Sequence, residues 1–311
     1  MTKEYDLIIV GAGPAGMTAG IYAGRYMLNT LILGMLPGGM ITESHKMCNF
    51  PTYEEISGTE FSQKLFKQVQ NLGVKVSPEQ VENIEKVGEN SNDKEEFKIK
   101  TSSNEYIAKK VIIATGTEKN KLNVPGEKEF LGRGVSYCAT CDAAFYKDLA
   151  GGVVGGGDAA LSSALLLSEY ANKVYVIYRK DKFRKANASW IKQAEEKENI
   201  EFVFNAVPKE IYGGEGKGVK GLELEDGRKI DLEGIFVEIG ATPEQKLSKE
   251  MGLETDEKGF IKVNKKQETN FEGVYAAGDI TDNPLRQVVT AAGQGAVAAH
   301  MAYETITKEN N

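Results

Sequence analysis

Cysteine and histidine are scarce in this sequence. The chain has three cysteines and two histidines among 311 residues. So few cysteines in so long a chain exclude a structural disulfide framework. A structural zinc site would need a second Cys-x-x-Cys or several histidines, and the sequence offers neither. We therefore expect no metal site.

Long apolar runs and blocks of positive charge are also missing. No apolar stretch approaches the roughly 18 residues that cross a bilayer, and the short, charged N-terminus resembles neither a signal peptide nor a transit peptide. Acidic residues outnumber basic ones by 45 to 38, for a net charge of -7, without the basic stripe that binds a nucleic-acid backbone. We expect a cytoplasmic protein with no membrane partner and no nucleic-acid partner.

The composition is that of a globular protein. Apolar residues make up 41% of the chain and charged residues 27%, close to the ordinary usage of soluble proteins. A length of 311 residues predicts one large domain or two medium domains, each with room for a complete core.

A glycine motif opens the chain. Residues 5–10 form a short run rich in Ile and Val, followed by Gly11, Gly13 and Gly16, a helix-compatible stretch and a second apolar run at 30–33. A strand that feeds G-x-G-x-x-G into a helix lets the backbone approach a pyrophosphate, which the helix N-terminus attracts. The unit therefore predicts a dinucleotide site. The acidic residue expected after the second strand is missing, so ribose recognition must come from elsewhere.

A second unit of the same kind begins near residue 152. An apolar run at 152–154 leads into Gly155, Gly157 and Ala160, then into a helix-like stretch and a strand-like run at 173–178. Alanine is acceptable at the third motif position because that position packs the helix against the strand. The chain thus contains two nucleotide-type units.

Positive charge follows the second strand of this unit. Arg179, Lys180 and Arg184 stand there, with Asp181 among them. Guanidinium and ammonium groups suit a 2′-phosphate, so the site favours NADP over NAD. An alternative stays open, in which the cations are solvated surface charges on a unit that no longer binds a nucleotide.

A Cys-x-x-Cys segment is the chemical centre of the sequence. Cys138 and Cys141 have the spacing of a redox pair in a reducing compartment, because the small ring that they close opens with little chain movement. Asp142, directly after the pair, is a candidate general acid for the leaving thiolate. The alternative for Asp142 is a solvated turn carboxylate. Cys48 is the odd cysteine, and we expect a plain buried thiol there.

The remaining segments predict hairpins and boundaries. A hairpin signal covers 96–108, and similar material recurs over 201–224 and 230–239. Strand-like runs give way to Gly, Thr and Pro near 116–118 and 240–244, where we expect the domain boundaries.

Together these residues resemble the low-molecular-weight thioredoxin reductases, the class II branch of the FAD-dependent pyridine nucleotide-disulfide oxidoreductases, over essentially the whole chain. The resemblance rests on the two glycine motifs, on Thr115-Gly116, on residues 132–142, which read GRGVSYCATCD, and on Gly278-Asp279 with Arg286-Gln287. It implies an α/β fold of two Rossmann-like, three-layer ββα nucleotide-binding domains. The second domain, 117–245, carries the cysteines and is inserted into an FAD-binding domain made of 1–116 and 246–311.

The resemblance also implies roles for single residues. The FAD contacts that it implies are Gly11, Gly13, Pro14, Ala15, Gly16, Gly38, Gly39, Asn49, Thr115, Gly116, Gly278, Asp279, Arg286 and Gln287. The NADPH contacts expected in the second domain are Gly155, Gly157, Ala160, Arg179, Lys180 and Arg184. By analogy, Cys138 attacks the partner's disulfide and Cys141 faces the flavin. Most members of the family are homodimers, and their two domains rotate so that the disulfide meets the flavin and the partner in turn.

The chain departs from the NADPH-using members of that family in its second glycine unit. Ser162 and Ser163 stand where an acidic pair is usual, and residues 178–180 read YRK in place of a His-Arg-Arg run. This pattern resembles archaeal and clostridial relatives in which NADPH use is weak or is replaced by another donor such as reduced ferredoxin. Met40 also replaces a common glutamine beside the flavin.

The function that follows is that of a thioredoxin-disulfide reductase. We expect electrons to pass from NADPH through FAD to the Cys138–Cys141 disulfide, and then to oxidised thioredoxin or a similar disulfide protein. Three alternatives stay open: a reductase with reduced ferredoxin or another donor, a flavin-dependent dithiol oxidase that consumes oxygen, and a non-catalytic flavin redox sensor.

Overall fold

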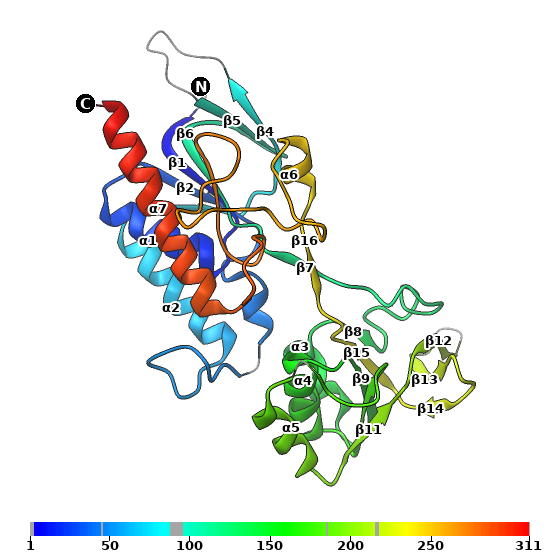
Figure 1. Cartoon of the computed structure of the whole chain (residues 1–311). Coiled ribbons are helices and arrows are strands. Elements are labelled where there is room, and N and C mark those ends of the chain that lie inside the picture. The colour runs from blue at the N-terminus through cyan, green and yellow to red at the C-terminus, as the bar shows by residue number, and fades with distance from the viewer. Residues whose placement is uncertain (1–2, 45, 88–95, 185, 215–217, 311) are drawn as a thin grey trace. The chain divides into compact units, whose positions relative to one another are not determined.

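The computed structural model describes residues 3–44, 46–87, 96–184, 186–214 and 218–310. The chain divides into two compact units, whose elements are labelled in Figure 1. The first unit joins Met1–Glu118 to Thr242–Asn311, and the second is Lys119–Ala241. The second unit is therefore inserted into the sequence of the first.

A seven-stranded sheet organises the first unit. β1 (Lys3–Val10) lies between β2 (Thr30–Leu33) and β6 (Glu105–Ile113) and runs parallel to both, while β3 (Lys75–Ser77) extends the sheet beyond β2. Helices or other segments cover both faces of such parallel strands. That burial explains the apolar second half of β1, the apolar sequence of β2 and the Val-Ile-Ile end of β6.

Two segments from distant parts of the sequence share the far edge of β6. β5 (Glu96–Thr101) runs antiparallel along its first half and continues the sheet to β4 (Val81–Val87), which confirms the hairpin predicted over 96–108. β17 (Val274–Ala276) runs parallel along its second half. β17 therefore ends at the same edge of the sheet as β1. The residues that follow β17 lie beside the first glycine motif.

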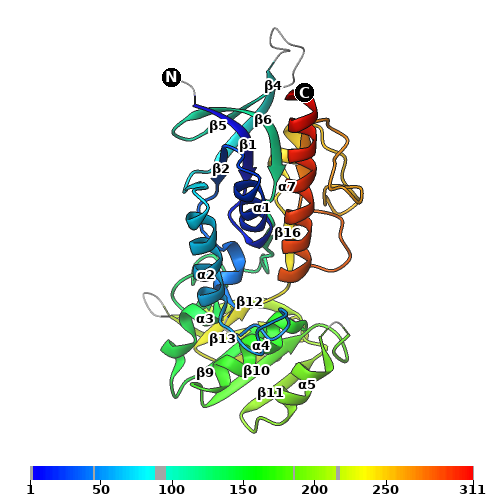
Figure 2. The same ribbon diagram turned by 90° about the vertical axis from the view of Figure 1, so that its left-hand side faces the viewer.

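Helices from the two ends of the chain pack against each other in this unit. α1 (Pro14–Arg25) follows the glycine motif, and α7 (Val288–Asn310) runs beside it in both views (Figures 1 and 2). One hydrophobic cluster joins them through small residues, among them Ala15, Ala19, Ala23, Ala291, Ala298 and Ala302. A side chain on Gly295 would lie 2.1 Å from the carbonyl oxygen of Ala15, so α7 needs glycine there. A further helix, α2 (Gly58–Asn71), packs against α1.

A five-stranded parallel sheet forms the centre of the second unit. Its order is β11 (Ile200–Phe204), β10 (Lys173–Tyr178), β9 (Ala150–Val154), β15 (Gly234–Val237) and β8 (Val135–Ser136). The remaining elements are the helices α3 (Ala139–Asp142), α4 (Asp158–Ser168) and α5 (Ala188–Glu195) and the antiparallel strands β12 (Pro208–Gly213), β13 (Val219–Leu224) and β14 (Lys229–Asp231).

The two faces of this parallel sheet have different partners. Val153 and Val176 share a cluster with Leu161 and other α4 residues. Their neighbours Val154 and Ile177 share a separate cluster with residues of the antiparallel sheet. Because side chains alternate along a strand, helices cover one face and the small sheet covers the other. The expected α/β fold with Rossmann-like, three-layer units is confirmed.

The hairpins predicted in the second unit are partly wrong. Residues 201–204 belong to β11 in the parallel sheet, and the hairpin of this region is β12 with β13. Residues 230–239 divide between β14, which pairs with β13, and β15, which pairs with β9. Short apolar runs do not reveal whether the neighbouring strand in the sheet is local or distant.

A two-stranded ribbon stands where the chain crosses between the units. β7 (Thr117–Lys119) pairs with β16 (Ala241–Pro243). The expected limits of the inserted domain, 117 and 245, fall on β7 and just beyond β16. The compact units change between 118 and 119 and between 241 and 242, within β7 and β16.

Candidate active site

A cleft of about 580 Å³ lies in the first unit, where β1, β6 and β17 end. Ligands of α/β sheets bind at the carboxyl ends of parallel strands. Most residues that the resemblance assigns to FAD line this cleft: Gly11, Gly13, Pro14, Ala15, Gly39, Thr115, Gly116, Gly278, Asp279, Arg286 and Gln287. The expected contacts Gly16, Gly38 and Asn49 are not among the lining residues.

The first glycine motif shapes the inner end of the cleft. Gly11 has a φ of 117°, and a side chain there would lie 2.1 Å from the carbonyl oxygen of Ala114. A side chain on Gly16 would lie 1.9 Å from the carbonyl oxygen of Gly11, so Gly16 packs α1 onto the strand end. Gly13 is the N-cap of α1, and a side chain there would meet no described atom within 4 Å. The unpaired amides of α1 are thus open to a pyrophosphate.

Two of the expected FAD residues do not line the cleft but hold residues that form it. Gly38 has a φ of 99°, and its amide donates to the carbonyl oxygen of Ala12 at 2.8 Å, which fixes the turn over the glycine motif. The Nδ2 group of Asn49 donates to Oε1 of Gln287 at 2.8 Å. Because Gln287 lines the cleft, Asn49 orients a lining side chain without lining the cleft itself.

Two residues of the cleft wall have buried polar atoms without a hydrogen-bond partner among the described residues. Thr115 Oγ1 and Arg286 Nε are buried and make no hydrogen bond within the described part of the chain. Burial raises the pKa of the Asp279 carboxyl, and the Arg286 charge partly offsets that effect. Buried polar groups normally have partners. These residues therefore fit a dinucleotide that brings hydrogen-bonding groups of its own.

Sequence reasoning missed several residues of the cleft, among them Glu79, Gln80 and Lys246. Glu79 follows β3, in a region without any motif. Its carboxylate accepts hydrogen bonds from the side chains of Thr101, Ser77, Tyr106 and Asn104 at 2.6 to 3.1 Å. Burial alone would raise the pKa of Glu79, but these four bonds outweigh it and lower the pKa from 4.5 to about 2.

Replacing Glu79 with glutamine should remove a pH-dependent part of the stability. A carboxylate with a folded-state pKa of about 2 against an ordinary 4.5 stabilises the fold above pH 4.5, and that contribution is lost as the pH falls toward 2. Urea unfolding from neutral pH down to about pH 2 measures it, with exposed Glu257→Gln as the control. The Glu79→Gln curve should lie below the unmodified one at neutral pH and converge with it in acid. Parallel curves would contradict the assignment.

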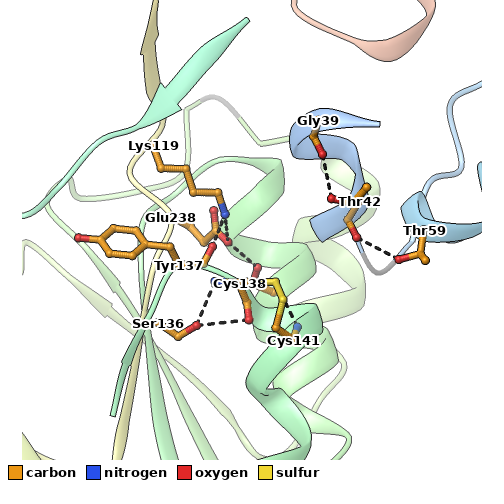
Figure 3. The surroundings of a disulfide bond; sticks show 10 residues. Gly39, Thr42, Thr59, Lys119, Ser136, Tyr137, Cys138, Cys141 and Glu238 are labelled. Atoms are coloured by element: carbon orange, nitrogen blue, oxygen red, sulfur yellow. Dashed lines mark hydrogen bonds and ion pairs between the residues drawn. A yellow bond between two sulfur atoms is a disulfide. The ribbon is translucent and has the colours of Figure 1, made fainter. Parts of the chain in front are cut away.

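The cysteine pair forms a disulfide in the second unit. Cys138 and Cys141 are joined with their Cα atoms 5.3 Å apart, across the short helix α3. Cys138 is half-buried and Cys141 is exposed. The Cys141 amide donates toward Sγ of Cys138 at 3.2 Å (Figure 3). An amide in that position would stabilise negative charge on the Cys138 sulfur after reduction.

Tyr137, directly before the disulfide, is held at both of its ends. Its hydroxyl donates to Oε1 of buried Glu127 at 2.5 Å, and its carbonyl oxygen accepts from Nζ of Lys119 (Figure 3). Lys119 also pairs with Glu238 at 3.5 Å, and Glu238 accepts from the hydroxyl of Ser163 at 3.2 Å. Burial and the Glu127 carboxylate raise the pKa of Tyr137. The strand end that leads into the disulfide is therefore fixed by charged groups on both sides.

Asp142 closes the same helical turn as the cysteines. Its amide donates to the carbonyl oxygen of Cys138 at 3.2 Å, and its side chain is half-buried. Burial, and then the Asp142 charge, raise the pKa of Tyr146, so the carboxylate lies near that phenol. This position keeps Asp142 beside the redox pair and leaves both of its alternative roles possible.

The second glycine motif has the geometry of a nucleotide-binding turn. A side chain on Gly155 would lie 2.2 Å from the carbonyl oxygen of Glu238, and Ala160 is fully buried. Gly157 is the N-cap of α4, and a side chain there would meet nothing within 4 Å among the described atoms. The strand order changes direction between β9 and β15, the place where open α/β sheets bind ligands.

The cations after β10 lie at the edge of the sheet that carries this motif, because β10 runs parallel to β9. Arg179 and Arg184 are exposed, and Lys180 is half-buried. Arg184 pairs with Asp181 at 2.9 Å. Exposed pairs of this kind contribute little free energy, so a phosphate could compete for the Arg184 guanidinium.

The expectation of a buried Cys48 is wrong, because this thiol is free and exposed. Its neighbour Met47 pairs with Ile56 in an isolated bridge and is buried in a small cluster. In an extended segment adjacent side chains point in opposite directions, so the burial of Met47 turns Cys48 outward.

The described residues offer neither a metal site nor a membrane-spanning helix. Over residues 3–44, 46–87, 96–184, 186–214 and 218–310, no group of three or more His, Cys, Asp or Glu side chains is arranged to hold a metal ion. In the same ranges, every helix is too short or too polar to cross a bilayer.

Comparisons with known proteins place these features in one family. Residues 5–295 match the family described as pyridine nucleotide-disulphide oxidoreductase. The chain is 41% identical over 303 residues to a thioredoxin reductase of Bacillus subtilis (strain 168), a match that covers 96% of this chain and 93% of the relative.

Solved structures agree with the sequence comparison. The Lactococcus lactis thioredoxin reductase in its FR conformation matches with a TM-score of 0.91 at 37% identity, over 98% of this chain and 99% of that chain. A ferredoxin-flavin thioredoxin reductase from Clostridium acetobutylicum matches with a TM-score of 0.54, also at 37% identity, over 99% of this chain and 100% of that chain.

Proposed function

The chain belongs to the pyridine nucleotide-disulphide oxidoreductase family, among the thioredoxin reductases, and we propose that it reduces a thioredoxin-like protein through Cys138 and Cys141, with electrons from NADPH passed on by FAD. The observation that carries the proposal is the Cys138–Cys141 disulfide on a second nucleotide-type unit, with the amide of Cys141 directed at Sγ of Cys138.

The cleft of the first unit is the proposed FAD site. The open N-terminus of α1, with Gly11 and Gly13, would hold the pyrophosphate, and Asp279 and Arg286 would supply polar contacts farther along the cleft. When bound, the flavin supplies two-electron chemistry between a nicotinamide and a disulfide. Gly38, through its turn, and Asn49, through Gln287, would fix the walls.

The chemistry of the partner's reduction follows from the two sulfurs. The Cys138 thiolate attacks one sulfur of the partner's disulfide, forms a mixed disulfide and releases the partner's other sulfur as a thiolate, to which Asp142 would deliver a proton as general acid. Cys141 then attacks Sγ of Cys138, releases the partner's second sulfur and restores the internal disulfide. Two electrons from the donor, together with two protons from the solvent, return the pair to the dithiol.

The second unit is the proposed NADPH site. The open N-cap Gly157 would receive the pyrophosphate, and the cations Arg179, Lys180 and Arg184 would face the 2′-phosphate. A ferredoxin donor is the second candidate, because a ferredoxin-flavin thioredoxin reductase is as similar to this chain in sequence as the Lactococcus enzyme. The serine at position 163, which donates to Glu238, stands where NADPH-using relatives have an acidic residue. This departure favours a donor other than NADPH.

The proposed reaction also suggests the compartment in which the protein works. Thiol–disulfide exchange with a dithiol partner belongs to a reducing compartment, so we propose a cytoplasmic location. A homodimer is proposed from the family resemblance.

Anaerobic titration of the FAD-loaded protein with NADPH tests the donor. The flavin absorbance should bleach, and oxidised thioredoxin should restore it while gaining two thiols per flavin reoxidised. Bleaching by reduced ferredoxin but not by NADPH would replace the donor and keep the disulfide route. Reoxidation by air with stoichiometric peroxide, without thioredoxin reduction, would identify an oxidase and overturn the proposal.

A further inference from the structure

An aromatic ring behind the cofactor cleft holds one of its charged residues. The guanidinium carbon of Arg286 lies 3.6 Å from the ring centroid of Phe260, close enough for a cation–π contact. Arg286 lines the cleft, and its buried Nε makes no hydrogen bond within the described chain. Phe260 is only 5% exposed and is not a lining residue. The ring therefore supports the guanidinium from the protein side.

The backbone fixes this ring firmly. The amide of Phe260 donates to the Asp256 carboxylate at 2.9 Å, and its carbonyl oxygen accepts from the Asp256 amide at 2.8 Å. The next residue, Ile261, donates to the carbonyl oxygen of Ile280 at 2.9 Å and accepts from the amide of Asp282 at 3.0 Å. Phe260 is thus in register with the segment that leads from Asp279 toward Arg286.

Two carboxyl groups near Arg286 feel its charge. Asp279 has a half-buried carboxyl whose raised pKa is partly lowered again by the Arg286 charge, and the same charge acts on Asp256. A free arginine side chain samples many rotamers, and ordering it on binding lowers affinity. A ring that already holds the guanidinium removes that loss.

We propose that Phe260 is a positioning residue for the cofactor, which orders the Arg286 guanidinium in the cleft wall before FAD binds. The inference rests on the proposed function, because it takes FAD as the ligand of this cleft. It concerns affinity and not chemistry, since Phe260 touches Arg286 and does not line the cleft.

A double-mutant cycle on FAD binding tests the inference. The flavin is removed, and FAD is titrated into the apoprotein of four forms: unmodified, Phe260→Leu, Arg286→Met and both together. Phe260→Leu should raise the FAD dissociation constant about 2- to 30-fold, the range of cation–π contacts. In the Arg286→Met background the same change should have almost no effect. Phe260→Tyr, which keeps the aromatic face, should bind FAD as tightly as the unmodified protein.

Several results would overturn the inference. An equal loss from Phe260→Leu in both backgrounds would show that Phe260 only fills space, and an unchanged dissociation constant would show that Arg286 needs no support. Thermal unfolding of each apoprotein checks that the variants are folded, and Phe260→Met takes the place of Phe260→Leu if that variant is not. An unmodified apoprotein that takes up no FAD would overturn the proposed function as well, whereas the other outcomes leave it standing.

Discussion

Cys141→Ser is expected to abolish reduction of a disulfide protein, with turnover falling about a thousandfold or more. The internal disulfide between Cys138 and Cys141 cannot form without the second sulfur, so a mixed disulfide with the partner has no group to resolve it. Thiol release from oxidised thioredoxin measures the effect. FAD content should be unchanged, because neither cysteine lines the cleft of the first unit.

Cys48→Ser is the matched control for that experiment. Cys48 is a free, exposed thiol outside the disulfide, so its loss should leave turnover intact. The two active-site variants also separate the roles of the sulfurs: Cys141→Ser should accumulate a stable mixed disulfide with thioredoxin, and Cys138→Ser should not. Retained turnover in Cys141→Ser would rule out the disulfide route. Unmodified protein without any turnover would instead favour a redox sensor.

Gly11→Ala is expected to produce protein without bound FAD and with reduced stability. The new methyl group would lie 2.1 Å from the carbonyl oxygen of Ala114, at a backbone φ of 117° that L-residues rarely adopt. The contact is with main chain at the end of β6, so relief requires β1 and β6 to separate. We expect a loss of about 2–4 kcal/mol in unfolding free energy, in the upper range for single substitutions, together with colourless purified protein.

Gly13→Ala separates folding from cofactor binding in the same motif. A methyl group on Gly13 meets no described protein atom within 4 Å, and its φ of -78° suits any residue. The apoprotein should therefore unfold like the unmodified one. FAD affinity should still fall, because the methyl group occupies the space through which the pyrophosphate approaches α1. If both variants bound FAD normally, the cleft would not be the flavin site.

Local sequence identified the elements whose structure depends on a few neighbouring residues. The first glycine motif predicted a strand, a tight turn and a helix because Gly11 and Gly16 occupy positions that a side chain would block. The spacing of Cys138 and Cys141 allows a disulfide across one helical turn. The hairpin of β5 and β6 followed from a polar turn between two strand-like runs. In each case the signal, a spacing or a turn, lies within a few residues along the chain, even where the group that blocks a side chain, such as the Ala114 carbonyl at Gly11, is distant.

Pairings between distant segments could not be predicted from those patterns. The side-chain donors that lower the pKa of Glu79 include residues of β5 and β6, and no motif marks them. Residues 230–239 have the composition of a hairpin, yet β14 and β15 join different sheets. The exposure of Cys48 depends on its neighbour Met47 taking the inward position.

The sequence by itself determined two nucleotide-type units, the redox pair and the family, since the spacing of the glycines and of Cys138 and Cys141 is a local pattern along the chain. Only the tertiary structure decided how the cofactor cleft is completed. The pairing of β17 with β6 carries Asp279 to the end of β1, and the fold brings Phe260 beneath Arg286. These contacts depend on which apolar surfaces pack together across the whole domain, and that packing leaves no periodic or spaced signature along the chain.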